Sequence, residues 1–140
     1  MNTVSRQMAA LVEARAKSRC EYCGMHQSLQ GATFHIEHVK PRSQGGGSDF
    51  ENLALCCPAC NLHKAARTHL TDPESGSVVA VYNPREQLWS EHFTWEKFQL
   101  VGLTAVGRAL IDALQLNHTR KIDIRRAEET FGLFPPPNRK

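Results

Sequence analysis

The sequence has no long run of hydrophobic residues, and this absence excludes two classes of protein. A membrane-spanning helix needs about 20 consecutive apolar residues, and no stretch of this 140-residue chain approaches that length. The amphipathic N-terminus, residues 1–18, also lacks the continuous apolar core of a secretory signal peptide. We therefore expect a cytoplasmic, globular protein.

The chain also has only a small excess of charge of one sign. The net charge is only +3, which permits nucleic-acid binding without requiring it. Residues 117–140 contain six Lys and Arg against three Asp and Glu, a difference equal to the whole surplus. Hydrophobic residues make up 41% of the chain, enough for one small domain, in which a bound metal would add stability.

The five cysteines do not form a disulfide pattern. They occur as Cys20-x-x-Cys23 and Cys57-x-x-Cys60, with Cys56 in addition, and the cytosol keeps such thiols reduced. Two C-x-x-C pairs predict a structural site in which four thiolates hold one tetrahedral zinc ion. The 33 residues between the pairs leave room for two strands. Buried free thiols are the alternative, and we expect Cys56 to pack as a small apolar residue.

The spacing of apolar residues predicts an α+β fold. Its first helix is capped by Thr3 or Ser5 and has an apolar face that includes Leu11 and Val12. Residues 89–95 are expected to return antiparallel to residues 78–82. The expected helices are 3–17, 61–68, 105–114 and 121–131, and the expected strands are 32–39, 53–55, 78–82 and 98–101.

Residues 35–67 carry the most informative pattern. His35-Ile-Glu-His38 lies in a predicted strand, which Pro41 ends because proline cannot donate to a sheet ladder. A glycine loop, residues 45–47, follows. Asn52-Leu53 then opens a second apolar run that leads into the second cysteine pair, and Asn61, His63 and Lys64 come directly after it.

This order resembles the HNH endonucleases, whose pattern is a carboxylate-His pair, an Asn-Leu after a Gly-Gly loop, and C-x-x-C followed by Asn or His and a Lys. The resemblance implies a ββα-metal (His-Me finger) core with a structural four-cysteine zinc site and an N-terminal helix. Residues 1–76 would form this core. Residues 77–140 resemble the extension of one bacterial branch, a hairpin-plus-helices elaboration packed on the core, with a disordered tail at 135–140.

The resemblance also implies metal-dependent hydrolysis of DNA that leaves a 5′ phosphate and a 3′ hydroxyl. His38 would be the general base, since a neutral imidazole can take a proton from water. Glu37 and Asn61 would bind a catalytic Mg²⁺ or Mn²⁺, which prefers such oxygen ligands, with His63 as a further candidate. For Asn61 a helix-capping role is the alternative. Adjacent strand residues face opposite ways, so Glu37 and His38 are expected where the strand ends and twists.

Other residues of the motif would position the base or contact DNA. Asn52 would hydrogen-bond backbone across the glycine loop and hold His38 in position. We expect mostly backbone recognition, and therefore weak sequence preference and strong salt dependence. The expected DNA contacts are Lys40, Arg42, Lys64 and Arg67.

Two functions of other classes compete with the nuclease. A non-catalytic zinc-knuckle module would bind nucleic acid without cutting it, and a protein-interaction domain would use the zinc only to stabilise its fold. A degraded nuclease would be expected to lack His38 or Asn61, and both are present. The sequence therefore favours the enzyme.

Overall fold

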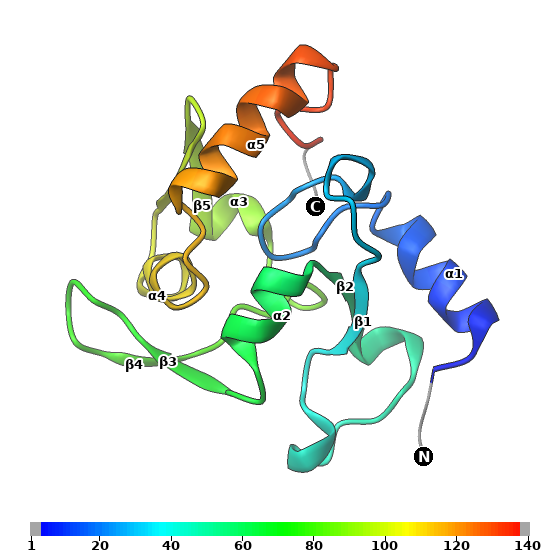
Figure 1. The fold of residues 1–140 in the computed structure, drawn as a ribbon. Helices are drawn as coiled ribbons and strands as arrows, with labels where there is room; N and C mark the ends of the chain where they lie inside the picture. Colours follow the sequence, from blue (N-terminus) through cyan, green and yellow to red (C-terminus); the bar gives the residue numbers. More distant parts are fainter. Residues whose placement is uncertain (1–3, 138–140) are drawn as a thin grey trace. The chain divides into compact units, whose positions relative to one another are not determined.

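The computed structural model of the chain describes residues 4–137, which divide into two compact units (Figure 1). The first unit ends at Ala66 and the second begins at Arg67. Helices and small antiparallel sheets occur in both, so the fold class is α+β as predicted. The sequence placed the end of the nuclease core at residue 76, whereas this division precedes a hairpin that spans residue 76. Among the described residues, no helix is both long and apolar enough to span a bilayer.

The first unit begins with helix α1, Arg6–Arg15. The Ser5 hydroxyl caps it by accepting a hydrogen bond from the Met8 amide, while Thr3 lies outside the described residues. Val12 is fully buried, but Leu11 is 57% exposed. The prediction that Leu11 faces the core is therefore wrong, because about 100° of helix rotation separates it from Val12. Arg15 anchors the helix by donating to the carbonyl of Phe50 (2.8 Å).

A two-stranded sheet forms the centre of this unit. Strand β1, His35–His38, pairs antiparallel with β2, Leu53–Cys56, so that Glu37 lies opposite Ala54 and His38 opposite Leu53. β2 is buried along its whole length. The first strand is shorter than predicted, and the loops hold three 3-10 turns: η1 (Gln27–Leu29), η2 (Arg42–Gln44) and η3 (Phe50–Asn52).

Helix α2, Pro58–Lys64, follows β2 directly. It begins three residues before the predicted start at Asn61, because Cys57 caps it and Pro58 suits the first helical turn. Asn61 therefore lies inside the helix, where its amide donates to the Cys57 carbonyl at 2.9 Å, and it is not a capping residue. The helix ends at Lys64, since Ala65 has a φ of 50°.

The second unit contains two separate hairpins. Strand β3, His69–Thr71, pairs with β4, Val78–Ala80, and β5, Phe93–Glu96, pairs with β6, Gln99–Gly102. The predicted pairing of residues 78–82 with 89–95 is wrong. Residues 72–77 close a tight turn in which the Asp72 carboxylate accepts from two amides, and such a short loop costs less entropy to close.

Three helices complete this unit: α3 (Trp89–His92), α4 (Ala105–Ala113) and α5 (Thr119–Thr130). Thr104 caps α4 as predicted, its hydroxyl accepting from the Gly107 amide. The basic surplus of residues 117–140 is only partly at the surface, because Lys121 and Arg125 are buried. Arg125 instead donates to the carbonyls of Phe98 (2.9 Å) and Leu116 (2.6 Å).

The aromatic residues of the second unit pack against one another. Trp89 stacks on Phe93, with ring centroids 5.5 Å apart, and Trp95 meets Phe134 edge-on at 5.0 Å. These contacts agree with a packing role for the tryptophans. Of the tail expected to be disordered, residues 135–137 are described and irregular, and residues 138–140 lie outside the described residues.

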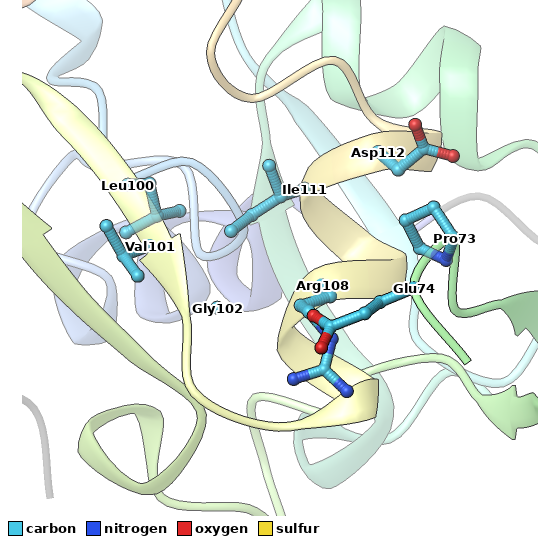
Figure 2. A pocket seen from close by; sticks show the side chains of 8 residues that line it. All are labelled: Pro73, Glu74, Leu100, Val101, Gly102, Arg108, Ile111 and Asp112. Carbon is cyan, nitrogen blue, oxygen red and sulfur yellow. The ribbon is translucent and has the colours of Figure 1, made fainter.

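A partly buried ion pair joins the first hairpin of this unit to α4. Arg108 donates to both carboxylate oxygens of Asp72, at 3.0 and 2.9 Å, and Asp72 is fully buried. Arg108 also lines an open cleft of about 620 Å³, and Figure 2 shows its side chain together with those of Leu100 and Ile111, which line the same cleft. Hydrogen bonds from Arg108 and Ser75 hold the pKa of the Asp72 carboxyl well below its usual range.

The depressed pKa of Asp72 predicts a specific acid sensitivity. A carboxyl whose pKa is lower in the folded state stabilises that state above its unfolded pKa, about 4, and loses this contribution as the pH falls further. We expect Asp72→Asn to be less stable than wild type at pH 7, and the difference to shrink below about pH 4. Urea unfolding followed by tryptophan fluorescence reports on this unit, which contains both tryptophans. A difference that stayed constant from pH 7 to pH 2 would contradict the prediction.

Candidate functional site

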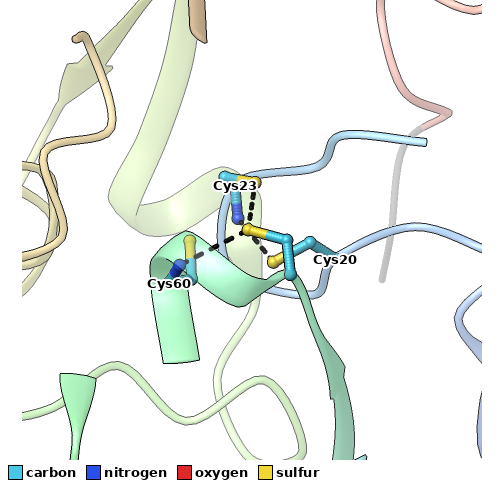
Figure 3. A group of neighbouring side chains, drawn as sticks. Cys20, Cys23 and Cys60 are labelled. Atoms are coloured by element: carbon cyan, nitrogen blue, oxygen red, sulfur yellow. Dashed lines mark hydrogen bonds between the residues drawn. The ribbon is translucent and has the colours of Figure 1, made fainter. Parts of the chain in front are cut away.

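Four cysteine side chains converge in the first unit. Cys20 and Cys23 lie on a turn that the Gly24 amide closes by donating to the Cys20 carbonyl. Cys57 and Cys60 come from the first turn of α2, where the Cys60 amide points at the Cys57 sulfur (3.4 Å). Figure 3 shows the sulfurs of Cys20, Cys23 and Cys60 turned toward a common point. The structure thus brings together the two predicted C-x-x-C pairs.

The cluster has the geometry of a tetrahedral metal site. All four ligand atoms lie within 4.8 Å of one another, and the sulfurs of Cys23 and Cys57 are 3.7 Å apart. Zinc–sulfur bonds of about 2.3 Å place tetrahedral ligands about 3.8 Å apart. In residues 4–137 no other group of three or more His, Cys, Asp or Glu side chains has such an arrangement. Four buried thiolates suit zinc.

Cys56 lies next to this cluster but outside it. Its side chain is fully buried, and its sulfur donates to the carbonyl of Cys57. Packing as a small apolar residue, as predicted, fits this position.

The cysteine turn is also tied to the central sheet. The Glu21 amide donates to the Leu55 carbonyl (2.9 Å), and the Leu55 amide donates to the Glu21 carboxylate (3.0 Å). These two bonds extend β2 toward the first cysteine pair. The metal cluster and the ββα segment are therefore parts of one structure.

Glu37, the predicted metal ligand, lies in the interior between two partners. Lys64 Nζ approaches one carboxylate oxygen at 2.6 Å, and the Tyr22 hydroxyl donates to the other at 2.6 Å. Lys64 also donates to the Val39 carbonyl at 3.3 Å. Burial raises the pKa of the Glu37 carboxyl, and the nearby ammonium of Lys64 opposes that rise. Lys64 is fully buried, so it is not presented to solvent as a phosphate contact would be.

Asn61 lies on the same face of α2 as Lys64. Residues three apart in a helix share a face, so Asn61 lies on the side from which Lys64 reaches Glu37. An amide and a carboxylate thus come from α2 and β1, two elements in contact. His63 is exposed and two residues from Asn61, about 200° around the helix axis. The structure does not place it on this face.

His38 faces away from Glu37, as strand alternation requires. Its imidazole is half-buried, and Nε2 lies 2.8 Å from the Ser48 hydroxyl. Burial and the positive charge of Arg42 lower the pKa of His38. The ring is therefore mostly neutral at pH 7, the form in which histidine can accept a proton.

The side chain of Asn52 bridges the two ends of the glycine loop. Its oxygen accepts from the Lys40 amide (2.9 Å), and its nitrogen donates to the carbonyls of Lys40 (3.1 Å) and Gly47 (2.8 Å). A Cβ at Gly46 would lie 1.8 Å from the Lys40 carbonyl oxygen, so only glycine fits there. These bonds fix the chain two residues after His38.

Sequence reasoning identified neither Tyr22 nor Ser48. Tyr22 lies between the first two cysteines, where spacing drew attention only to the thiols. Ser48 directly follows the three glycines. A hydroxyl group next to that loop was the one feature of the sequence that could have indicated a contact with His38. Of the expected DNA contacts, Lys40, Arg42 and Arg67 are exposed.

The metal cluster predicts that Cys57 is essential for folding and that the neighbouring Cys56 is not. Cys57→Ser should lose zinc and unfold the first unit, because a structural zinc contributes on the order of 10 kcal/mol. Cys56→Ser is the matched control and should retain one zinc per chain. Metal analysis of the purified proteins and far-ultraviolet circular dichroism measure both properties. Equal zinc loss in both variants would contradict the assignment of ligands.

The Glu37–Lys64 pair predicts a large loss of stability when only one partner is removed. Lys64→Met leaves a buried carboxylate without its counter-charge, which costs roughly 3–5 kcal/mol. Glu37→Gln/Lys64→Met removes both charges and should recover part of that loss. Amide hydrogen exchange of β1, followed by mass spectrometry, measures the local stability. If the double variant were no more stable than Lys64→Met, the unpaired charge would not be the cause of the lost stability.

Comparison with known proteins agrees with this geometry. The model of the HNH endonuclease family matches residues 20–67, from the first cysteine of the cluster to just beyond α2. No curated protein and no solved structure gives a significant match. The matched segment contains the four cysteines, the paired strands with Glu37 and His38, and the short helix with Asn61. Residues 20–67 of this chain therefore match the HNH endonuclease family, as the sequence motif indicated.

Proposed function

We propose that the chain is a metal-dependent endonuclease that hydrolyses DNA phosphodiester bonds. The observation that carries the proposal is the setting of His38. Its neutral, half-buried imidazole is held on the edge of a loop clamped by Asn52, within the segment that matches the HNH family. The exposed side chains of Lys40 and Arg42 follow closely in the chain.

In this proposal His38 is the general base. It takes a proton from a water molecule as the water oxygen attacks phosphorus, a role worth roughly 10²–10⁴ in rate. Asn52 keeps the backbone after His38 in place, so the imidazole needs little reorganisation during the reaction. Lys40 and Arg42 would hold the phosphate backbone, with Arg67 as a further candidate for a DNA contact.

Glu37 and Asn61 would hold the catalytic metal. Carboxylate and amide oxygens are the donors that Mg²⁺ and Mn²⁺ prefer. When bound, such an ion stabilises charge on the phosphoryl oxygens as a Lewis acid. Lys64 already places a positive charge 2.6 Å from one Glu37 oxygen, so that position suits a cation. Lys64 would have to leave this oxygen before it could contact a phosphate.

The remaining parts of the proposal concern zinc, the second unit and the compartment. The four-cysteine cluster would hold a structural zinc that fixes the start of α2. Residues 1–76 would be the nuclease core, and residues 77–140 would be its C-terminal elaboration. A reducing cytoplasm suits a cluster of free thiols in residues 4–137.

A non-catalytic zinc-knuckle module that binds nucleic acid is the second candidate. The cysteine cluster and the exposed basic side chains fit it equally well. It gives no reason for an imidazole held by Ser48 or for a loop clamped by Asn52. These contacts favour the enzyme.

Supercoiled plasmid tests the proposed function. Wild type should nick or linearise it with Mg²⁺ or Mn²⁺ and not with EDTA, while His38→Ala should cut at least about 100-fold more slowly. His69→Ala, which changes an exposed histidine of the second unit, is the matched control and should cut like wild type. Salt-dependent DNA binding without cleavage by any of the proteins would favour the binding module.

A further inference from the structure

Ser48 makes the one hydrogen bond that the His38 imidazole has within residues 4–137. The Ser48 hydroxyl lies 2.8 Å from Nε2 of the ring, and among the described residues it has no other hydrogen-bond partner. We infer that Ser48 is a positioning residue that keeps the proton of His38 on Nε2 and leaves Nδ1 as the nitrogen that takes the water proton. This inference rests on the proposed function.

The position of Ser48 is set by the same amide that fixes the chain after His38. Asn52 Nδ2 donates to the Gly47 carbonyl, one residue before Ser48, and to the Lys40 carbonyl, two residues after His38. One side chain therefore holds both ends of the loop that joins the imidazole to the hydroxyl. The Ser48–His38 contact is therefore a consequence of the hydrogen bonds that Asn52 makes to Lys40 and Gly47.

The glycines of the loop allow the backbone to come close enough for Asn52 to form these hydrogen bonds. A Cβ on Gly46 would lie 1.8 Å from the carbonyl oxygen of Lys40 and 2.9 Å from the Asn52 side-chain nitrogen. Gly45 has a φ of 91°, a conformation that other residues rarely adopt. The loop thus approaches the backbone closely enough to place Ser48 beside the ring.

The hydrogen bond decides which ring nitrogen can act on water. A neutral imidazole carries one N–H and one lone pair. Ser48 occupies Nε2 whether its hydroxyl donates or accepts, so the nitrogen left for water is Nδ1. A base needs its lone pair at that position, and the proton must therefore lie on Nε2, with Ser48 accepting from it.

The same arrangement serves the reaction step. As the water oxygen bonds to phosphorus, the water O–H bond breaks and its proton moves to Nδ1. The bond between phosphorus and the 3′ oxygen breaks with its electron pair going to that oxygen, which takes a proton from solvent water to become the 3′ hydroxyl. The ring becomes an imidazolium with protons on both nitrogens. Nε2–H continues to donate to Ser48 throughout, so the contact needs no rearrangement.

Kinetics of Ser48 variants on a duplex oligonucleotide with Mn²⁺ test the inference. Ser48→Ala should lower kcat roughly 10- to 100-fold, part of the 10²–10⁴ that a positioned base supplies. KM should stay unchanged, because the lost contact acts in the transition state. Ser48→Thr keeps the hydroxyl and should stay within about 3-fold of wild type. Ser43→Ala, an exposed serine of the same loop, should have no effect.

A double variant separates positioning from a structural role. If Ser48 acts through His38, Ser48→Ala should slow the wild type but not the His38→Ala protein any further. An equal effect in both backgrounds would overturn the inference.

Nitrogen-15 spectra of the His38 ring provide a readout that does not depend on cleavage. Wild type should show a protonated Nε2 and an unprotonated Nδ1, and Ser48→Ala a mixture of both forms. A wild-type ring protonated on Nδ1, or a Ser48→Ala protein with wild-type kcat, would overturn the inference. Cleavage by His38→Ala at the wild-type rate would overturn the proposed function itself, whichever tautomer the spectra show.

Discussion

The first unit depends on the convergence of four thiols. Cys20 and Cys23 come from a turn, Cys57 and Cys60 from a helix, and 33 residues separate the two pairs in the chain. Those residues include both strands of the central sheet and the glycine loop. A bond network that closes this long segment removes much of the entropy of the unfolded chain. The remaining contacts of the unit therefore form in a chain whose conformational freedom the cysteine cluster has already reduced.

Within that constraint, strand alternation divides the chemistry between two sides of β1. Glu37 points inward to Tyr22 and Lys64, and His38 points outward to Ser48. Each side is supported by a different element, α2 for the carboxylate and the glycine loop for the imidazole. The two adjacent residues therefore have separate environments, one buried and one open to water.

The sequence predicted the parts of this unit in which residue type limits the structure strongly. Paired C-x-x-C spacing has few explanations other than a metal cluster, and the order of motifs from Glu37 to Lys64 indicated two strands and a helix. The start of α2 was missed because the thiol of Cys57 was assigned to the metal only. It also caps the helix. Capping by cysteine has no distinct pattern in a sequence.

Partners of polar side chains were harder to predict. Lys64 was expected to contact DNA, and lysine is rarely buried. Its burial here follows from its pairing with Glu37. The hairpin of residues 69–80 was missed for a similar reason. Its strands are only three residues long, and the Asp72–Arg108 pair that supports it joins residues 36 positions apart. Such contacts follow from the fold and leave no local pattern.

Helix α2 has only seven residues, from Pro58 to Lys64. Its cysteines, Asn61 and Lys64 all depend on their angular positions around a single axis. One residue inserted between Cys60 and Lys64 would turn everything after it by about 100°, which would move Lys64 away from Glu37. The exposed residues 31–33, just before β1, do not depend on such angular positions. Natural variation in length within this domain should therefore accumulate before β1 and be absent from α2.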